Sequence, residues 1–560
     1  MIQCSIDYLR RVVIPLLLGM TLIACRQSGV DFFWSSTGTR MYLDSVPEVK
    51  ENAISGSLWR GERGHCVAII KSETNLTGVD VSAGDLRYGR NTIPSSNILI
   101  RFGLPVFGDS LVGPYHQCGD RDSLVIPRIK VFDILDNASG ASVIDPPYRP
   151  VWLTVSVPVD AAPGTYKGTV VLRAGGKRIA SLPLKIKVDP HILPPPDEWQ
   201  FHLDLWQNPY AVARYHGVEL WSPEHFALMD PVISILANAG QNAITTTITD
   251  RPWNGQTEDP FGSMVKKIRH SDGKWDYDYS VFDTWVEYMM RHGIDKQISC
   301  YSLITMVSSF DYYDEASSTV KFVEARPGTR KYIEFWEPFL HDFAAHLREK
   351  DWLGKTYLAM DESHREDLVA VRDFVSRVEP EFQLSLAGLY HPEVEEDLDY
   401  LSVTFHGEFP PEVVQRRRQE GKTSTIYTCC DEKYPNTFIA SPPSEAAWIP
   451  LYSIANGHDG YLRWAYNSWT KDPMKDARYR MFAAGDCFLV YPEGRSSVRM
   501  EMLTAGIQLC EKTRILKEEL RGESLEELNM ALNGFNFADM AQNGAQAALD
   551  SLINIIDTIQ

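Results

Sequence analysis

Hydrophobic and polar residues follow two different patterns along the chain, and the change falls near residue 190. Between residues 51 and 190, short segments such as 151–157 and 168–173 alternate apolar and polar positions. Turn-forming sequences such as 160–164, Asp-Ala-Ala-Pro-Gly, separate these segments. Strict alternation is typical of strands with one buried face, and several such strands at this spacing predict a β-sandwich domain over 51–190.

Beyond a proline-rich connector at 189–196, short apolar runs alternate with longer amphipathic segments. The connector marks a domain boundary because consecutive prolines stiffen the chain and end regular structure. Most runs are separated by a helical pattern, although the link over 389–398 is short for a full helix. Eight strands alternating with helices predict a (β/α)₈ TIM-type barrel over 191–495. The eight runs are 201–206, 243–248, 297–301, 356–360, 383–387, 400–405, 423–427 and 460–464.

The two ends of the chain lie outside these domains. Residues 496–560 predict a C-terminal helical segment, with a long amphipathic helix over 496–520 and one or two further helices. At the other end, Arg10 and Arg11 precede the apolar stretch 12–24, which is typical of a signal peptide and too short to span a bilayer comfortably. Residues 26–50 are polar with little periodicity, so we expect a tether there.

The apolar stretch ends in Leu-Ile-Ala-Cys at 22–25, which resembles the lipobox of bacterial lipoproteins. In such proteins the cysteine becomes the lipidated N-terminus, so we interpret 1–25 as a lipoprotein signal peptide and Cys25 as the lipidation site. The protein would then be exported to the periplasm or the outer-membrane surface of a bacterium, with the lipid as its only membrane contact. The alternative is an ordinary signal peptide that contains a chance cysteine.

Composition and charge narrow the class of partner. The formal net charge of −19 argues against a nucleic-acid partner, whose phosphates would be repelled. The 14 Trp and 25 Tyr are compatible with carbohydrate sites, which stack aromatic faces on sugar rings. Cysteine spacing matches no zinc pattern, and we expect no metal. Export permits disulfides, and Cys66 with Cys118 is one candidate pair.

Polar and aromatic residues gather at the carboxyl ends of the predicted strands, where a barrel of parallel strands builds its active site. The acid pair Asp361–Glu362 directly follows the run 356–360 and is the candidate catalytic pair. The candidate substrate-binding residues at the other strand ends are Trp206, Asn208, Arg251, Tyr301, Tyr390, His391, His406, Trp464, Tyr466 and Asn467.

Each candidate also has a structural interpretation. An Asp–Glu dipeptide by itself is most often solvated surface, and a Trp at a strand end is as often a core plug as a sugar platform. His391 and His406 could be buried structural histidines, and Asp204 could brace the barrel. The gathering of these residues at one end of the predicted barrel favours a functional site. Positions selected only because they follow a predicted strand would not all be polar or aromatic.

The adjacency of the two acids points to one kind of glycoside cleavage. Most glycosidases place two carboxylates on opposite sides of the scissile bond. Neighbouring residues of a strand point to opposite faces, so Asp361 and Glu362 can converge only because the strand ends there. Such a pair suits substrate-assisted hydrolysis, in which the 2-acetamido oxygen of the sugar is the nucleophile.

Three segments in order resemble glycoside hydrolase family 123. They are Leu-Asp-Leu-Trp-Gln-Asn-Pro at 203–209, the Asp361–Glu362 pair, and Gly-Tyr-Leu-Arg-Trp-Ala-Tyr-Asn at 460–467. The resemblance covers about residues 190 to 520. It implies a retaining, exo-acting β-N-acetylgalactosaminidase that forms an oxazoline-type intermediate, takes a glycan with terminal β-linked N-acetylgalactosamine, and needs no metal or other cofactor. The family's acid pair carries over to Asp361 and Glu362.

The substrate-assisted mechanism assigns roles that we treat as hypotheses. Asp361, ionised, would hold the acetamido N–H, and Glu362, with a raised pKa, would act as general acid and then base. Trp206 or Trp464 would stack under the sugar, and Tyr301, Tyr390 or Tyr466 would contact the acetamido oxygen. The residues left for hydroxyl recognition are Asn208, Arg251, His391 and His406.

Two alternatives stay open at this stage. The first is the same mechanism acting on N-acetylglucosamine, which differs from N-acetylgalactosamine by the orientation of one hydroxyl. The second is a glycan-binding surface lipoprotein without catalysis, which would have no need of the acid pair. The aglycone, the role of the sandwich and the oligomeric state are not determined by the sequence.

Overall fold

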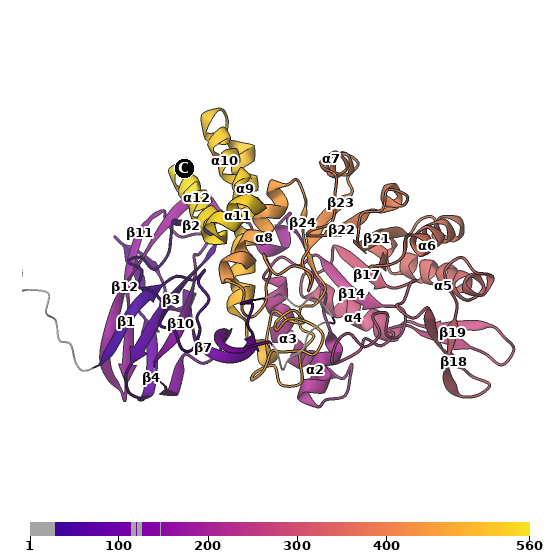
Figure 1. Cartoon of the computed structure of the whole chain (residues 1–560), viewed down its shortest axis with the longest axis horizontal. Helices are drawn as coiled ribbons and strands as arrows, with labels where there is room; N and C mark the ends of the chain where they lie inside the picture. The colour runs from indigo at the N-terminus through magenta and orange to yellow at the C-terminus, as the bar shows by residue number, and fades with distance from the viewer. Residues whose placement is uncertain (1–28, 114–118, 120–125, 146, 560) are drawn as a thin grey trace, which may run out of the picture.

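The computed structural model describes residues 29–113, 119, 126–145 and 147–559. The predicted signal peptide 1–25 and its Cys25 lipidation site lie outside the described residues. Within those residues, no helix has the length and apolar character needed to cross a membrane. A sheet-rich domain occupies one end of the molecule, a barrel the other, and helices from the C-terminus lie over the junction (Figure 1).

Two sheets form the N-terminal domain. One has the strand order β1-β3-β10-β7-β8, and the other contains β2-β12-β11-β4-β9 with β5 and β6 attached at β11. Apolar side chains from both sheets, such as Ile70 and Leu172, pack into one core, which confirms the predicted β-sandwich. The strands are β1 (Val30–Ser35), β2 (Ser57–Arg60), β3 (Arg63–Ser72), β4 (Leu76–Ala83), β5 (Leu86–Tyr88), β6 (Asn91–Ile93), β7 (Ile98–Asp109), β8 (Arg128–Leu135), β9 (Gly140–Ile144), β10 (Tyr148–Ser156), β11 (Gly164–Ala174) and β12 (Lys177–Ile192).

Strand β1 corrects the expected tether over 26–50. Residues 30–35 pair antiparallel with β3 as an edge strand of the sandwich. Trp34 is buried in the sandwich core, and its indole N–H donates to the Pro183 carbonyl at 3.1 Å. The expectation was wrong here because the mean polarity of 26–50 hid a short apolar strand, Val-Asp-Phe-Phe-Trp-Ser.

The eight apolar runs after the connector form eight parallel strands in one sheet, in the order β13-β24-β23-β22-β21-β20-β17-β14. This confirms the predicted barrel. As the short link 389–398 indicated, only one turn of 3₁₀ helix, η4 (Glu395–Asp397), joins β21 to β22. The strands are β13 (His202–Leu205), β14 (Ala243–Thr247), β17 (Gln297–Tyr301), β20 (Thr356–Met360), β21 (Gln383–Gly388), β22 (Tyr400–Thr404), β23 (Thr423–Tyr427) and β24 (Gly460–Arg463).

Side-chain amides complete the seam between β13 and β14, the first and last strands of that order. Gln241 Oε1 accepts from the Leu205 N–H at 3.0 Å, and Asn242 Oδ1 accepts from the Leu203 N–H at 2.8 Å. One main-chain bond, from Asn242 N–H to the Leu203 carbonyl at 2.9 Å, adds to them. These bonds satisfy buried strand-edge groups that would otherwise be unpaired.

Helices cover the outside of the barrel, and a small four-stranded sheet extends from it beside the loops after β14 and β17. Asp311 of that sheet accepts from the Asp250 N–H at 2.8 Å, so the sheet anchors the loop that follows β14. The sheet comprises β15 (Lys266–Arg269), β16 (Trp275–Asp278), β18 (Ser309–Asp314) and β19 (Thr319–Glu324). The helices are α2 (Pro209–His216), α3 (Pro223–Ala237), α4 (Ser280–Arg291), α5 (Arg330–Glu349), α6 (Arg365–Val378), α7 (Pro411–Gln419) and α8 (Pro443–Ala455).

The C-terminal segment forms a long helix, α9 (Val498–Glu519), and three further helices. The Ser497 hydroxyl caps α9 by accepting from the Met500 N–H at 3.0 Å. The expectation of one or two further helices was wrong because Gly544, at φ +75°, turns the chain between the last two. Those further helices are α10 (Glu523–Asn533), α11 (Phe537–Asn543) and α12 (Ala545–Thr558).

A buried ion network joins the sandwich to the barrel. Asp133 of β8 is fully buried and pairs with Arg499 of α9 at 3.0 Å and with Arg40 at 3.1 Å. The Tyr491 hydroxyl donates to the same carboxylate at 2.8 Å. Because an unpaired charge in this position would be costly, the network holds the two domains in one relative position.

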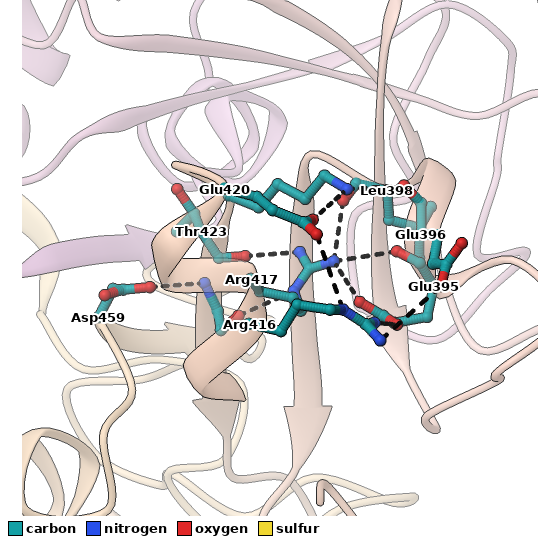
Figure 2. A network of polar contacts seen from close by, with 10 residues as sticks. Glu395, Glu396, Leu398, Arg416, Arg417, Glu420, Thr423 and Asp459 are labelled. Carbon is teal, nitrogen blue, oxygen red and sulfur yellow. Dashed lines mark hydrogen bonds and ion pairs between the residues drawn. The ribbon is translucent and has the colours of Figure 1, made fainter. Parts of the chain in front are cut away.

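A second network lies at the amino-terminal end of the barrel strands (Figure 2). Arg417 of α7 is fully buried and donates to the Glu395 carboxylate at 3.1 Å, the Leu398 carbonyl at 2.9 Å and the Thr423 carbonyl at 3.0 Å. Its Nε donates to the Ser424 hydroxyl at 2.9 Å. This guanidinium therefore links α7 to the starts of β22 and β23.

The cysteine hypothesis for the sandwich is wrong. Cys66 lies in the central strand β3 as a buried free thiol, and burial raises the pKa of that thiol above its usual range. It therefore does not pair with Cys118, which lies outside the described residues. The sequence places two cysteines in one domain, but it does not determine the direction in which each side chain points.

Candidate active site

Strand β20 delivers the acid pair to the mouth of the barrel. Its residues Tyr357 and Ala359 pack in the barrel-interior cluster, whereas Leu358 and Met360 pack in the outer core. By this alternation Asp361, directly after the strand, continues the inward face. Helix α6 begins only at Arg365, so Glu362 lies in the short loop between strand and helix. The strand end thus lets two neighbouring carboxylates serve the same opening.

The two carboxylates have different surroundings. Asp361 is half-buried, whereas Glu362 is exposed. The Tyr427 hydroxyl, at the end of β23, donates to Glu362 Oε1 at 2.5 Å. Tyr427 is itself buried, so it holds Glu362 from the barrel wall. The second carboxylate oxygen of Glu362, Oε2, receives no bond from this tyrosine.

The pKa shift falls on Asp361. Burial and the neighbouring Glu362 carboxylate raise the pKa of Asp361 to about 7, and the Glu362 N–H and the Trp253 side chain partly offset that rise. The sequence had placed the raised pKa on Glu362. That stays a prediction, and the structure adds a raised pKa at Asp361, which is the more enclosed of the two residues. Because the Glu362 charge contributes to this rise, the proton affinity of Asp361 depends on its neighbour.

Three aromatic rings lie together at this opening, and we call Trp206, Trp253 and Tyr301 the aromatic floor. The Trp206 ring centroid lies 4.9 Å from that of Trp253 and 4.5 Å from that of Tyr301, and Trp253 lies 5.0 Å from Tyr301. Trp464 lines a pocket with Trp206 and Trp253 and packs on Phe482 at 4.9 Å. The structure therefore brings together the predicted residues Trp206, Tyr301 and Trp464.

The side chains of three other predicted binding residues form hydrogen bonds within the protein. Asn208 is buried and caps α2, its side chain accepting from the Ala211 N–H at 3.2 Å. Asn467 is buried and exchanges hydrogen bonds with the Asn208 main chain at 2.8 and 3.0 Å. The Tyr466 hydroxyl donates to the Val232 carbonyl at 2.7 Å, inside the core. Their polar groups are occupied within the protein.

The remaining candidates lie on loops and make their contacts away from the acid pair in the described part of the chain. Arg251 is exposed and pairs with Asp250 at 3.5 Å. The Tyr390 ring stacks on Phe409 at 6.1 Å, and the His391 carbonyl closes a turn. His406 is exposed and packs on Phe537 of α11 at 5.4 Å. Their predicted roles in sugar recognition stay predictions.

Two residues of this arrangement were missing from the predicted site. Tyr427 bonds Glu362, and Trp253 adjoins Asp361 and completes the aromatic floor. Alternation along β23 would have found Tyr427, because Thr425 and Tyr427 share the inward face. Trp253 lies several residues beyond its strand, where loop conformation decides the position of the ring. Across the described residues, no cluster of three or more His, Cys, Asp or Glu side chains could hold a metal ion.

Two family models match this chain. One is described as the glycoside hydrolase 123 catalytic domain and matches residues 206–516, and the other as the glycoside hydrolase 123 N-terminal domain and matches residues 34–174. The chain belongs to glycoside hydrolase family 123. It is thus a glycoside hydrolase, and its substrates are glycans.

Two solved structures align with this chain. A family 123 glycoside hydrolase from Clostridium perfringens, described in a study of glycolipid glycan hydrolysis, aligns with a TM-score of 0.85 at 24% identity, covering 95% of this chain and 98% of that one. A family 39 glycoside hydrolase from Bacteroides cellulosilyticus WH2 aligns with a TM-score of 0.35 at 12% identity, covering 77% and 81%. The first shares the complete fold, and the second is too distant to support an argument. No curated protein sequence matches the chain.

Proposed function

We propose that this family 123 enzyme is a retaining, exo-acting β-N-acetylgalactosaminidase that uses the 2-acetamido group of its substrate as the nucleophile. The observation that carries the proposal is the placement of the two adjacent acids at one strand end, one half-buried beside the aromatic floor and one exposed and held by Tyr427. Two carboxylates that leave the same strand end are poorly placed to attack a sugar from opposite sides. They suit a substrate that brings its own nucleophile.

In the first step the acetamido oxygen attacks C1 while the C1–O bond to the leaving group breaks. Asp361, ionised, accepts the acetamido N–H and stabilises the positive charge of the oxazolinium ion. Glu362 transfers its proton to the leaving oxygen. In the second step water attacks C1, Glu362 takes a proton from that water, and the acetamido group is restored. Two inversions at C1 give net retention.

The proton of the acid pair has to change place when substrate binds. In the free enzyme, burial favours the proton on Asp361. A bound acetamido N–H donates to Asp361 and stabilises its anion, so the shared proton moves to Glu362. The Tyr427 hydroxyl already occupies Glu362 Oε1, which leaves Oε2 as the oxygen that protonates the leaving group.

The aromatic residues supply the sugar site in this proposal. Trp464 is half-buried, lines one pocket with the buried Trp206, and offers an apolar face for the sugar ring. Tyr301 packs on Trp206 and Trp253 and lies near Asp361, which supports it as the donor to the acetamido oxygen. The similarity to the Clostridium perfringens enzyme, whose description names glycolipid glycans, supports glycan chain ends as the substrate class.

Location is a separate part of the proposal. The Leu-Ile-Ala-Cys sequence at 22–25 supports an exported lipoprotein anchored through Cys25 at the periplasmic face or outer-membrane surface. Radiolabelled palmitate incorporation into the wild type and its loss in Cys25→Ala would test this. An unlabelled wild-type protein would contradict it.

A set of three aryl β-glycosides tests the reaction. We expect hydrolysis of the N-acetylgalactosaminide, no measurable hydrolysis of the galactoside that lacks the acetamido group, and release of the β-anomer first by NMR. Equal rates on the galactoside would exclude the acetamido nucleophile. Faster hydrolysis of the N-acetylglucosaminide would keep the mechanism and change the sugar. Tight glycan binding without any turnover would favour the non-catalytic alternative.

A further inference from the structure

One buried acid of the barrel has no part in the proposed mechanism. Asp204 of β13 is fully buried, and among the described residues only the side chains of Tyr400 and Trp206 act as hydrogen-bond donors toward its carboxylate. It lies two positions before Trp206 on the same strand face, which places it about 7 Å deeper in the barrel. A carboxylate in the interior without a counter-ion is costly, so its presence calls for a physical explanation.

No positive charge compensates Asp204 in the described part of the barrel. The groups that face it are Trp206 and His202 on its own strand, Tyr301 on β17 and Tyr400 on β22. Burial and the Lys296 charge lower the pKa of His202 to about 4, so His202 is neutral near pH 7. Burial also raises the pKa of Asp204 to about 7, with Tyr400 and Trp206 opposing that rise.

The acid pair at the mouth has no cation beside it either. The groups that shift Asp361 and Tyr427 are acids, a thiol and the Trp253 side chain, without a described lysine or arginine. Elsewhere in the molecule the buried carboxylate of Asp133 is paired with arginine, at 3.0 Å from Arg499. The interior beneath the sugar site is therefore electrostatically negative.

Tyr301 connects Asp204 to the reacting end of the site. The charges of both Asp204 and Asp361 raise the pKa of its phenol, so the tyrosine lies near both carboxylates. Its ring also contacts Trp206 and Trp253, the other members of the aromatic floor. The Asp204 charge thus lies directly beneath the surface on which the sugar would rest.

We propose that Asp204, when ionised, is a negative charge beneath the sugar that stabilises positive charge at the ring and gives the site a preference for cationic sugar mimics. The inference rests on the proposed function, in which C1 and the oxazolinium ion become positive. Asp204 does not touch the sugar and acts through the barrel interior, where charges interact more strongly than in water. An interior carboxylate without a counter-ion is favourable when the cation arrives with the reaction.

Two ring analogues of N-acetylgalactosamine test the proposal by calorimetry at pH 7.5. One is an acetamido-piperidine whose ring amine is protonated, and the other is the corresponding lactam, which is neutral. We expect Asp204→Asn to weaken binding of the piperidine by about tenfold or more and to leave the lactam within about twofold. The matched control is Glu445→Gln, because Glu445 is another buried acid, with a pKa raised by burial to about 8, that accepts from the Asn436 N–H. This control should leave the ratio of the two affinities unchanged.

The outcomes separate this inference from the proposed function. Equal weakening of both analogues in Asp204→Asn, or no change in either, would overturn the role of Asp204 while the binding itself supports the sugar assignment. Failure of both analogues to bind the wild type would overturn the proposed function and the inference with it.

A variant that keeps Asp204 gives a second test should Asp204→Asn fail to fold. In the double variant Asp361→Asn with Glu362→Gln, the acid pair is neutral and Asp204 alone supplies the negative charge. We expect the piperidine still to bind several-fold more tightly than the lactam. Equal affinities in this variant would overturn the proposal.

Discussion

The two ends of the barrel differ in whether their buried charges have a partner of opposite sign. At the amino-terminal end, the buried Arg417 guanidinium is surrounded by the Glu395 carboxylate, main-chain carbonyls and a serine hydroxyl (Figure 2). At the carboxyl end, Asp361 and the buried Asp204 lie among aromatic rings, with no described lysine or arginine among the groups that shift their pKa values. Paired charges stabilise the amino-terminal end of the barrel. In the mechanism proposed above, the negative charges without a counter-ion at the carboxyl end would stabilise a cation.

The largest effect should come from neutralising the acids at the carboxyl end. Asp361→Asn and Glu362→Gln should each lower kcat/KM for a natural N-acetylgalactosaminide by about 10³-fold or more, because general acid and electrostatic contributions each have that size. Thermal unfolding should change little, since neither residue anchors the fold. Steady-state kinetics beside calorimetry would measure both quantities.

The leaving group separates the two roles. An aryl glycoside with a very good leaving group needs no proton, so Glu362→Gln should recover much of its rate on that substrate and Asp361→Asn should not. Glu366→Gln, an exposed acid on α6, is the matched control and should behave as the wild type. Equal recovery in both acid variants would contradict the division of roles.

The next largest effect should appear in stability at the amino-terminal end. Arg417→Met removes a guanidinium that satisfies several buried acceptors, and we expect a loss of about 3 kcal/mol in the free energy of unfolding. Denaturant titration would measure it. The folded fraction should keep the wild-type KM, because the network lies at the opposite end of the strands from the site.

A double variant sharpens this result. Removing Glu395 as well, in Arg417→Met with Glu395→Met, should restore part of the lost stability, since the carboxylate left without one partner is then also absent. A loss of catalytic efficiency in correctly folded Arg417→Met would contradict the separation of the two ends.

A smaller effect should appear in the pH profile, where kcat/KM should change tenfold per pH unit. Burial and the Glu362 charge raise the pKa of Asp361 to about 7, so Asp361 holds a proton below that pH and loses it above. The productive arrangement also holds one proton, on Glu362. We therefore expect kcat/KM of the wild type to fall as the pH rises through about 7, measured over pH 5–9.

Glu362→Gln should reverse this dependence. With an activated leaving group, the variant needs only an ionised Asp361, so its rate should rise with pH and then level off. The apparent pKa should lie below that of the wild type because the Glu362 charge no longer raises it. A wild-type profile that rises through pH 7 would contradict the shared proton.

The smallest effect should come from Tyr427. Tyr427→Phe keeps the ring and removes the hydroxyl that donates to Glu362, and we expect about a tenfold decrease in kcat with KM changed less. Tyr452→Phe, a similar change in the outer core, is the control and should leave the kinetics unchanged. An unaffected kcat in Tyr427→Phe would show that Glu362 is positioned by other groups.

Much of the architecture could be predicted from the chain because it depends on local patterns. Each of the eight apolar runs became a barrel strand, and the acid pair at 361–362 lies at the end of one, as expected. The β1 strand was missed because six residues carry too little pattern to stand out in a polar stretch. The pairing of Cys66 failed because it depends on side-chain direction in a sandwich of unknown register.

Within the site, the sequence selected strand ends correctly but could not orient every side chain. Trp206 and Trp464 line one pocket, while Asn208 and Asn467, from the same two strand ends, bond to each other within the scaffold. A polar residue at a strand end has the same sequence signature in both cases. Only the position of its neighbours decides whether its donors face substrate or protein.

The sequence by itself therefore determined the sandwich, the barrel, and the strand end that carries Asp361 and Glu362, because alternation and spacing act within a few residues of the chain. The tertiary structure decided that the pKa of Asp361 is raised, that Tyr427 holds Glu362, and that Asp204 lies without a counter-ion beneath the aromatic floor. These features depend on burial and on distances between strands far apart in the chain. Such quantities exist only once the barrel has closed.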